Sequence, residues 1–328
     1  MGGNHSASAR ALAVLKMSIL HSKIRGAALM LALWALFLLS AMIISWALDI
    51  DSHLTVSAQA NRILEAEAMA CSGAEVALHP SIKPGSPNLT RRVNSRESYE
   101  ARITGEGGRL NLHFITGVII AGDPAQRDTY REILRKYLKI KGIDMNESDH
   151  MIDCLLDWID PDNLVRLNGA EESEDYHPAN RPLRRIDELK EVKGWAEFTS
   201  QPGWDADFTL STNSAKIDPN WASREVLLAL PGMTEAMADN LLQMRRGPDG
   251  IDGTQDDVRF KNNSEVAAAL GLNAQQFKKF EELIDVNDPV LRVVSVGKSG
   301  NTTRVVQMVF TRMDRMGSIP QIKMWKEL

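Results

Sequence analysis

An uncharged apolar segment near the N-terminus constrains the fold of this chain more than any other feature of its sequence. Residues 27–48 contain no charged side chain, and the first acidic residue is Asp49. A helix rises about 1.5 Å per residue, so a segment of this length can cross the roughly 30 Å hydrocarbon core of a membrane. The preceding residues 1–26 carry only basic charges. This asymmetry predicts that residues 1–26 stay in the cytoplasm and that the chain beyond Asp49 lies on the other side.

Three interpretations of this segment are open. A cleaved secretory signal would usually have an apolar part of only about 7–15 residues. A signal anchor would keep the whole segment as a single membrane span. The third is a class III signal like that of type IV pilin-like proteins, which a peptidase cuts on the cytoplasmic side after a glycine that follows basic residues. The sequence Arg25-Gly26-Ala27 fits such a cut, which makes Gly26 and Ala27 the candidate processing site and residues 1–26 a leader.

The helical pattern continues beyond the apolar segment. Apolar or small side chains recur on one face, within a sector of about 80°. These residues are Val56, Ala60, Leu64, Cys71, Ala74 and Leu78. We therefore expect one long helix from Ala27 to about Leu78, in which a membrane helix continues without a break into an amphipathic one.

Length, charge and cysteine content set further limits. With 328 residues, the chain can hold two domains or one domain with a large insertion. Its net charge of −5 disfavours a dedicated nucleic-acid-binding protein. The two cysteines, Cys71 and Cys154, are too few for a disulfide framework. A bridge between them is open, but the position of Cys71 on the apolar face of the long helix favours a buried free thiol.

Strand patterns occur at both ends of the part that follows the long helix. Residues 97–104 alternate apolar and polar side chains, and the glycine-rich residues 105–108 predict a hairpin turn to a second strand at 109–113. Near the C-terminus, residues 291–296 and 303–312 flank a glycine-containing turn and predict a second hairpin. An isolated hairpin is marginally stable, so both are expected to close one sheet that packs on the long helix.

The residues between these hairpins are dominated by helical patterns and loops. The expected helices are 125–140, 147–159, a short one within 185–194, 220–230, 234–246, 264–270 and 274–284. The chain is therefore predicted to have an α+β fold, in which a large helical region is inserted into an antiparallel sheet domain.

An acidic stretch in the helical region is the first candidate for chemistry. Asp153, Asp157 and Asp160 share one face of the predicted helix, and further acids follow between Asp162 and Asp175. Like charges this close repel, and a hard cation relieves that repulsion, because Ca²⁺ accepts about 6–8 oxygen ligands in a flexible loop. A solvated acidic face without an ion is the alternative, and the spacing is not that of an EF-hand.

The glycine-containing loop of residues 247–257 is a second candidate for calcium binding. Its acids are Asp249, Asp252, Asp256 and Asp257. Interleaved glycines suit a backbone that wraps around an ion, but a polar loop between helices has the same composition.

The sequence contains no cysteine and histidine cluster with zinc-site spacing, no phosphate-binding glycine loop and no nucleophile elbow. A membrane-anchored metallohydrolase would rest on the clustered acids alone, because nothing near them supplies a base or a nucleophile. We therefore expect no enzymatic activity.

Residues 217–246 predict two helices joined by Leu230-Pro-Gly-Met233, a helix-hairpin-helix unit. Such units often bind the DNA backbone through loop amides. Here Thr234 and Glu235 follow the loop, and no lysine lies nearby to neutralise a phosphate. A purely structural hairpin is therefore favoured over DNA binding.

Several motifs together resemble the general secretion pathway protein K family, the large minor pseudopilins of type II secretion systems. They follow the family's order along most of the chain and comprise residues 25–34, Leu156–Asp162, Gly169-Ala-Glu171 with Tyr176 after it, Glu188–Gly194 and the hairpin Pro219–Arg246. The resemblance implies a pilin-like domain interrupted by a large helical domain. The predicted domains are a leader (1–26), a transmembrane helix (27–48), the first part of the pilin-like domain (49–116), a helical insertion domain (117–286) and the second part of the pilin-like domain (287–328).

The resemblance also implies a place at the tip of a short periplasmic pseudopilus, with the minor pseudopilins I and J as partners. Most pilin-like proteins carry a glutamate at the fifth mature position, which pairs with the N-terminal amine of a neighbouring subunit. Here that position is Leu31, which suits a subunit with no partner above it. Family members bind calcium in the helical domain, and this implies Asp157, Asp160, Asp162, Glu171 and Asp175 as candidate Ca²⁺ ligands.

We therefore expect a non-enzymatic minor pseudopilin that initiates or caps pseudopilus assembly for protein export across the outer membrane. A prepilin peptidase would process it, and one span would hold it in the inner membrane with most of the chain in the periplasm. No nucleic-acid partner is expected. The alternative is a membrane-anchored helix-hairpin-helix protein that binds DNA in a pilin-type uptake machine.

Overall fold

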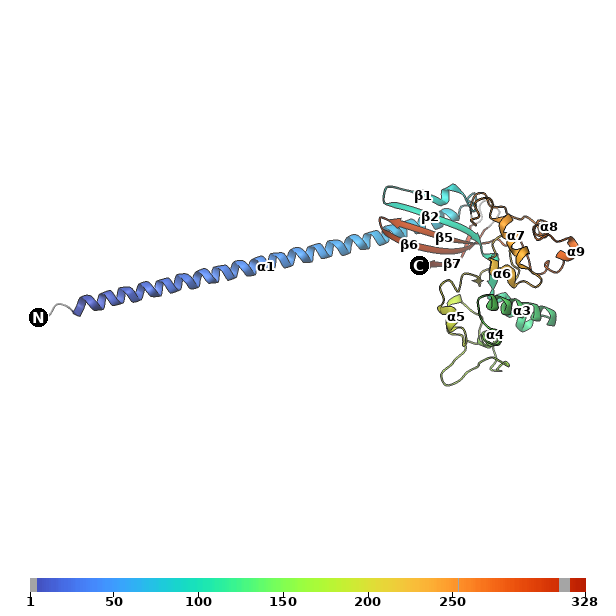
Figure 1. Cartoon of the computed structure of the whole chain (residues 1–328), viewed down its shortest axis with the longest axis horizontal. Helices are drawn as coiled ribbons and strands as arrows, with labels where there is room; N and C mark the ends of the chain where they lie inside the picture. The colour runs from blue at the N-terminus through green and yellow to red at the C-terminus, as the bar shows by residue number, and fades with distance from the viewer. Residues whose placement is uncertain (1–4, 253, 313–318) are drawn as a thin grey trace. The chain divides into compact units, whose positions relative to one another are not determined.

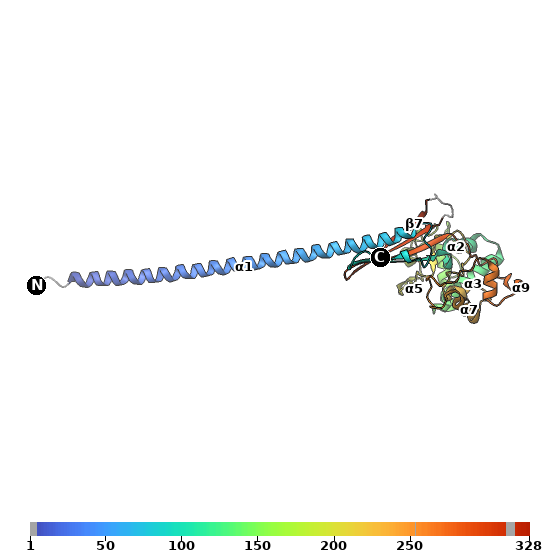
Figure 2. The ribbon, with the colours of Figure 1, turned by 90° about the horizontal axis from the view of Figure 1, so that it is seen from above.

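The structure is a computed structural model that describes residues 5–252, 254–312 and 319–328, with side chains described from Ala28 onward (Figures 1 and 2). The chain divides into two compact units, Met1–Arg62 and Ile63–Leu328. The second unit contains the sheet, the shorter helices and the candidate site.

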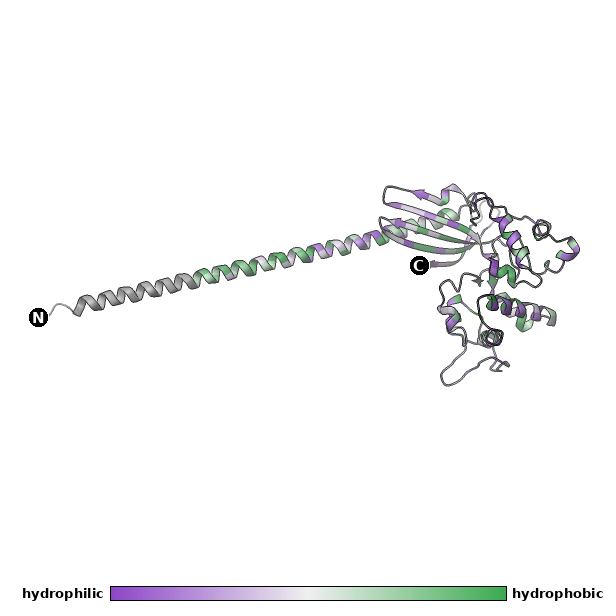
Figure 3. Cartoon of the chain, in the orientation of Figure 1, coloured by the Kyte–Doolittle hydropathy of each residue, from purple (hydrophilic) through white to green (hydrophobic). Residues whose placement is uncertain are grey.

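Helix α1 (His5–Ala77) runs through the first unit and continues into the second. Its side chains from Ala28 to Arg62 are exposed, and Figure 3 shows how apolar residues dominate the earlier part of this range. Within the described residues, Ala28–Ala77 is the one helix that is long and apolar enough to cross a membrane, judged by length and composition. The expected long helix is confirmed, but it begins at His5, earlier than the expected Ala27, and it ends one residue before Leu78.

The second unit contains an antiparallel sheet of five strands in the order β1-β2-β5-β6-β7. Their bounds are β1 (Thr90–Arg92), β2 (Glu97–Gly105), β5 (Val290–Ser299), β6 (Thr302–Thr311) and β7 (Gln321–Glu327). Strands β2 and β5 are neighbours, with Tyr99 opposite Gly297 and Ile103 opposite Val293. The sheet therefore joins segments on either side of the helical region, as Figure 1 shows.

The end of α1 packs against this sheet through small side chains. Ala66, Ala70 and Ala74 are completely buried, at the four-residue spacing that places them on one helix face. The sheet contributes larger apolar side chains to the same core, among them Ile103, Val293, Met308 and Phe310. Burying side chains of this size stabilises a fold by about 1.5–3 kcal/mol each. The alanines permit a close approach of helix and sheet.

The helical region lies between β2 and β5 in the chain and has its own hydrophobic core. Its helices are α2 (Leu112–Ala121), α3 (Pro124–Ile140), α4 (Met145–Ile159), α5 (Ala196–Ser200), α6 (Arg224–Ala229), α7 (Glu235–Arg245), α8 (Asn263–Ala269) and α9 (Ala274–Phe277). The described residues of the second unit also form the 3₁₀ helices η1 (Pro87–Leu89), η2 (Glu106–Gly108) and η3 (Ile186–Lys190). The two longest of these α-helices start at aspartate caps, because the Asp123 and Asp144 carboxylates accept backbone N–H groups of the first turn. The predicted α+β fold class is confirmed.

The first predicted hairpin is wrong. Residues 106–108 form η2, and the following strand β3 (Leu110–Asn111) pairs in parallel with β4 (Phe208–Thr209) instead of turning back on β2. Gly108 permits close packing, because a β-carbon at this residue would lie 2.3 Å from the Trp221 carbonyl carbon. Strand β2 takes β5 as its partner instead, a contact between distant segments that local turn chemistry does not reveal.

The structure differs from the sequence-based prediction at three further elements. Strand β7 was not predicted, because its mixed and largely exposed residues carry little alternation. The strand expected at residues 109–113 stops at Asn111, whose side chain caps α2 by accepting the His113 and Phe114 amides. The helix expected at 274–284 ends at Phe277 and continues as turns.

Both cysteines are free, so the alternative of a Cys71–Cys154 bridge is excluded.

Candidate metal centre

Helix α4 carries three aspartates that are almost completely buried. Asp153, Asp157 and Asp160 are 4%, 0% and 4% exposed, and they project from the C-terminal half of the helix and its cap. A carboxylate removed from water is costly unless it is hydrogen-bonded or paired with a cation. The partners of these three side chains therefore decide what each one does.

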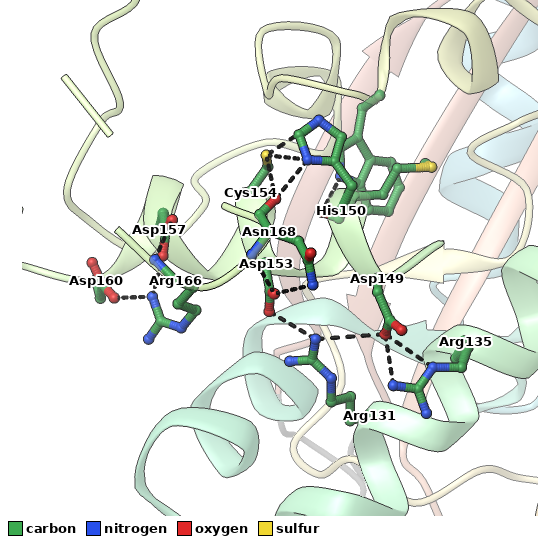
Figure 4. A network of polar contacts seen from close by, with 12 residues as sticks. Arg131, Arg135, Asp149, His150, Asp153, Cys154, Asp157, Asp160, Arg166 and Asn168 are labelled. Atoms are coloured by element: carbon green, nitrogen blue, oxygen red, sulfur yellow. Dashed lines mark hydrogen bonds and ion pairs between the residues drawn. The ribbon is translucent and has the colours of Figure 1, made fainter. Parts of the chain in front are cut away.

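Asp153 is fully occupied by protein partners. Arg131 of α3 places its Nη2 atom 2.8 Å from Oδ1, and the backbone N–H of Asn168 donates to Oδ2 at 3.2 Å (Figure 4). The side-chain amide of Asn168 also donates to Oδ2. Asp153 therefore anchors the loop that follows α4 and does not join the other two aspartates.

Asp157 and Asp160 share one cation, the guanidinium of Arg166. Its Nη1 atom lies 2.5 Å from Asp157 Oδ1 and also donates to Asp160 Oδ2 (Figure 4). The backbone N–H of Arg166 donates to the second oxygen of Asp157 at 3.2 Å. The second oxygen of Asp160, Oδ1, is buried and has no hydrogen-bond partner among the described residues.

Glu171 completes a group of three carboxylates. One oxygen from each of Asp157, Asp160 and Glu171 lies within 4.8 Å of the others. Both Glu171 oxygens are buried and lack a hydrogen-bond partner in the described part of the chain. Burial and the negative charge of Asp157 raise the pKa of Glu171 to about 7. Burial also raises the pKa of Asp160, against the lowering effect of Arg166.

Gly169 allows the Glu171 segment to reach this position. A β-carbon at residue 169 would lie 1.8 Å from Asp157 Oδ2, a distance that no side chain can adopt. The backbone of Gly169-Ala-Glu171 therefore passes directly against the α4 carboxylate. Three converging carboxylates, with three of their oxygens unpartnered, form the hard oxygen donor set that suits Ca²⁺. The residues present fit that ion.

The other two predicted ligands are less closely placed. Asp162 is exposed, and its Oδ1 atom accepts the Leu164 amide at 2.9 Å, yet its charge contributes to the raised pKa of Glu171. Asp175 is exposed and is not part of the carboxylate group. Both stay predictions as ligands.

In the second acidic loop, arginines pair with two of the four acids. Asp252 contacts Arg245 at 2.8 Å and Arg246 at 3.1 Å, and Asp257 contacts Arg259 at 2.5 Å. Although burial opposes it, the hydrogen bond from Arg245 lowers the pKa of Asp252.

The remaining two acids hold the turn itself. Asp256 accepts the Asp249 amide at 3.1 Å, and Asp249 accepts the Ile251 amide at 2.8 Å. Gly253 of this loop lies outside the described residues. In the described ranges, three potential ligands converge only at Asp157, Asp160 and Glu171, so the second calcium site stays a prediction.

Two important residues of the site were not identified from the sequence. Arg166 stands alone between two acidic runs, and that isolated basic residue was a signal for an internal counter-ion. Gly169 was noticed only as part of a motif, and its contact with Asp157 requires the folded chain.

The predicted hairpin contains α6, α7 and the connecting residues 230–234, in which Gly232 has a positive φ of 84°. Arg224 of α6 pairs with Asp239 and Glu235 of α7. These ion pairs join the two helices to each other. Assignment as a helix-hairpin-helix unit stays a prediction.

The predicted processing residues Gly26 and Ala27 lie within α1, but their side chains are outside the described part of the structure. Residues 1–4 of the predicted leader also lie outside the described residues. The cleavage between Gly26 and Ala27 therefore stays a prediction.

Comparison with known proteins finds similarity to one family. Residues 108–201, which include α2 to α4 and the carboxylate group, match the model of the first domain of type II secretion system (T2SS) protein K. "Putative type II secretion system protein K" of Escherichia coli (strain K12) is 26% identical over 248 residues, which cover 67% of this chain and 75% of that protein. Type II secretion system protein K of Dickeya chrysanthemi is 31% identical over 65 residues, which cover 19% of this chain and 18% of the relative.

A solved structure shares the fold. One chain in the crystal structure of the GspK-GspI-GspJ complex from the enterotoxigenic Escherichia coli type 2 secretion system matches with a TM-score of 0.55 and 15% identity. The match covers 85% of this chain and 97% of that chain. The family model, the curated relatives and the fold agree, and they confirm that this chain resembles general secretion pathway protein K, a minor pseudopilin of type II secretion systems.

Proposed function

We propose that this chain is a non-enzymatic minor pseudopilin that initiates or caps the type II secretion pseudopilus at its tip. The observation that carries the proposal is the construction of α1: its exposed apolar part is suited to a membrane, and its last turns are buried against the sheet of a domain that resembles protein K. One continuous helix thus links membrane insertion to a bulky folded domain. Such a subunit can seed a filament of helices and block addition above itself.

Small residues on the apolar segment support close helix packing within the filament. Alanines at 28, 32, 35 and 41 are exposed in this structure and would allow neighbouring helices to approach closely. Leu31, at the fifth position after the proposed cut, supplies no carboxylate for the amine of a subunit above it. Both features fit a terminal subunit.

The proposed partners are the minor pseudopilins I and J, by analogy with the complex in which the matching solved chain lies. A prepilin peptidase would remove residues 1–26 and leave Ala27 as the first residue. The helix would then hold the protein in the inner membrane with its second unit in the periplasm.

The test is to express the full chain in cells that have an active prepilin peptidase and a complete set of pseudopilins, and to determine where the mature protein begins. We expect the mature protein to start at Ala27 and Gly26→Val to accumulate as a precursor. Pseudopilus assembly and secretion should fall in the variant, whereas Gly3→Val, a change far from the cut, should be processed normally. A wild-type protein that keeps its first residues would contradict the proposal.

We propose in addition that the helical region binds Ca²⁺ through Asp157, Asp160 and Glu171, with Asp162 and Asp175 as further candidate ligands. Support comes from the unpartnered buried oxygens of Asp160 and Glu171 and from Gly169, where any side chain would force Asp157 to shift. A bound ion would neutralise three carboxylates that one arginine leaves partly unsatisfied.

Thermal unfolding of the full chain in detergent tests this calcium proposal. Millimolar Ca²⁺ should raise the melting temperature relative to a chelator, because a ligand that binds only the folded state stabilises it. Asp160→Ala should reduce that gain. Asp149→Ala, on the same helix but paired with Arg131 and Arg135, should leave the gain unchanged. Identical wild-type curves with and without Ca²⁺ would count against the site.

A further inference from the structure

Arg166 donates hydrogen bonds to two of the three carboxylates that the proposed calcium ion would need. Its Nη1 atom donates to one oxygen of Asp157 and one of Asp160, both members of the carboxylate group. An ion held by these carboxylates at about 2.3–2.6 Å would lie only a few ångströms from the guanidinium, so the two positive charges would repel each other. The two cations therefore compete for the same carboxylates.

We propose that Arg166 is the internal counter-ion of the carboxylate group and sets its calcium affinity, because an incoming ion must displace the guanidinium. The inference rests on the proposed calcium site and adds a residue that acts against binding. Calcium binding at this site would then be an exchange, in which the ion replaces the guanidinium of Arg166.

The charges favour such an exchange. The single positive charge of Arg166 faces Asp157 and Asp160, while Glu171 and one oxygen of Asp160 lack a hydrogen-bond partner in the described residues. The nearest arginines of α3 are engaged elsewhere, since Arg131 pairs with Asp153 and Asp149, and Arg135 pairs with Asp149. A divalent ion brings twice the charge of Arg166 and can contact all three carboxylates.

The guanidinium can leave without unfolding its loop. The Arg166 side chain is 28% exposed, and its neighbours Val165 and Leu167 are 61% and 96% exposed, so this part of the loop lies at the surface. The backbone has its own anchors, in the Arg166 amide on Asp157 and the Asn168 amide on Asp153. Exchange therefore requires rotation of one side chain, with the loop backbone held in place (Figure 4).

The sign of one mutation distinguishes this role from two others. If Arg166 competes with calcium, its removal strengthens binding. If Arg166 orients the carboxylates for the ion, its removal weakens binding. If it only stabilises the loop, its removal lowers stability equally with and without the ion.

The experiment uses the full chain in detergent, with Ca²⁺ titrations by calorimetry and thermal unfolding in chelator and in saturating Ca²⁺. Arg166→Ala should tighten the calcium Kd about tenfold or more, the scale of a buried charge-assisted hydrogen bond. It should also lower Tm in chelator and show a larger calcium-induced rise than the wild type. Arg166→Lys, which keeps the charge, should lie between the two proteins. If the alanine variant does not fold, Arg166→Gln provides the same comparison.

The matched control is Arg181→Ala, whose guanidinium pairs with Glu188 at 3.0 Å, outside the carboxylate group. Its calcium Kd should equal that of the wild type. If the wild type binds calcium and Arg166→Ala binds it equally or more weakly, the proposed role of Arg166 is overturned and the calcium site itself is retained. Absence of binding in both proteins overturns the calcium site as well, whereas binding by the variant alone supports the competition.

Discussion

Gly297, near the C-terminal end of strand β5, lies against the backbone of Ala70 in helix α1. A β-carbon at residue 297 would be 2.2 Å from the Ala70 nitrogen and 2.1 Å from the Ala66 carbonyl oxygen. The strand therefore contacts the helix backbone directly, with no side chain between them. This contact joins the end of the membrane-type helix to the sheet through the two smallest residues available.

Gly297→Ala should destabilise the second unit, because the helix would have to move away from the sheet. We expect a loss of about 1–3 kcal/mol or more, the usual scale for overpacking a core. Denaturant unfolding of the full chain in detergent measures it. Gly117→Ala is the control: its β-carbon would meet nothing within 4 Å, and alanine is favoured over glycine within a helix by about 1 kcal/mol. Equal stability of the two variants would refute the tight helix–sheet contact.

Gly169→Ala should disturb the carboxylate group, because the new β-carbon would overlap Asp157 Oδ2 at 1.8 Å. The variant should melt at a lower temperature and lose most of the calcium-induced rise proposed for the wild type. Comparison of melting curves with and without Ca²⁺ checks both effects. A variant that retains the full calcium response would show that the Gly169 segment does not form part of the site.

Glu171 should make calcium-free stability depend on pH. Its pKa is raised from 4.5 to about 7, so the folded state binds a proton more tightly than the unfolded state. The free energy of unfolding should then fall as pH rises between these two values and level off above pH 7. Glu171→Gln should remove this part of the pH dependence, as unfolding series in chelator at several pH values would reveal. Calcium binding should strengthen over the same interval, because the ion requires the carboxylate.

Glu106 should be essential for joining the sheet to the helical region. It is 1% exposed, and Arg292 of β5 donates to both of its oxygens at 2.7 and 2.6 Å. Thr209 of β4 donates a third hydrogen bond at 2.6 Å. Glu106→Gln leaves the largely buried Arg292 without its charge partner, so we expect a loss of about 3–5 kcal/mol.

The same site predicts a loss of stability in acid. Despite burial, which acts in the opposite direction, the positive charge of Arg292 lowers the pKa of Glu106. A lowered carboxyl pKa contributes stability above its unfolded value of 4.5, and that contribution disappears as pH falls through the folded value. The free energy of unfolding of Glu106→Gln should lack this contribution, so it should fall less in acid than that of the wild type. The control Glu97→Gln, at an exposed hydrogen bond with Asn94, should behave as the wild type.

Local sequence patterns were sufficient for the elements whose contacts are local. The charge-free segment and its helical continuation predicted α1, and the long amphipathic patterns predicted α3 and α4 to within two residues at either end. The acidic pattern on α4 likewise indicated Asp157 and Asp160, and the family resemblance added Glu171. These features depend on side-chain periodicity and on chain proximity, which a sequence displays directly.

Tertiary structure decided the remaining features, because they depend on contacts between distant residues. The glycines at 105–108 looked like a hairpin turn, yet Gly105 and Gly108 make room for Trp221, and β2 pairs with β5 instead. Of the acids at 249–257, which stay a predicted ion-binding loop, two pair with Arg245 and Arg259. Which acids receive an arginine and which remain unpartnered is settled only when the chain folds, and that difference separates Asp153 from Glu171.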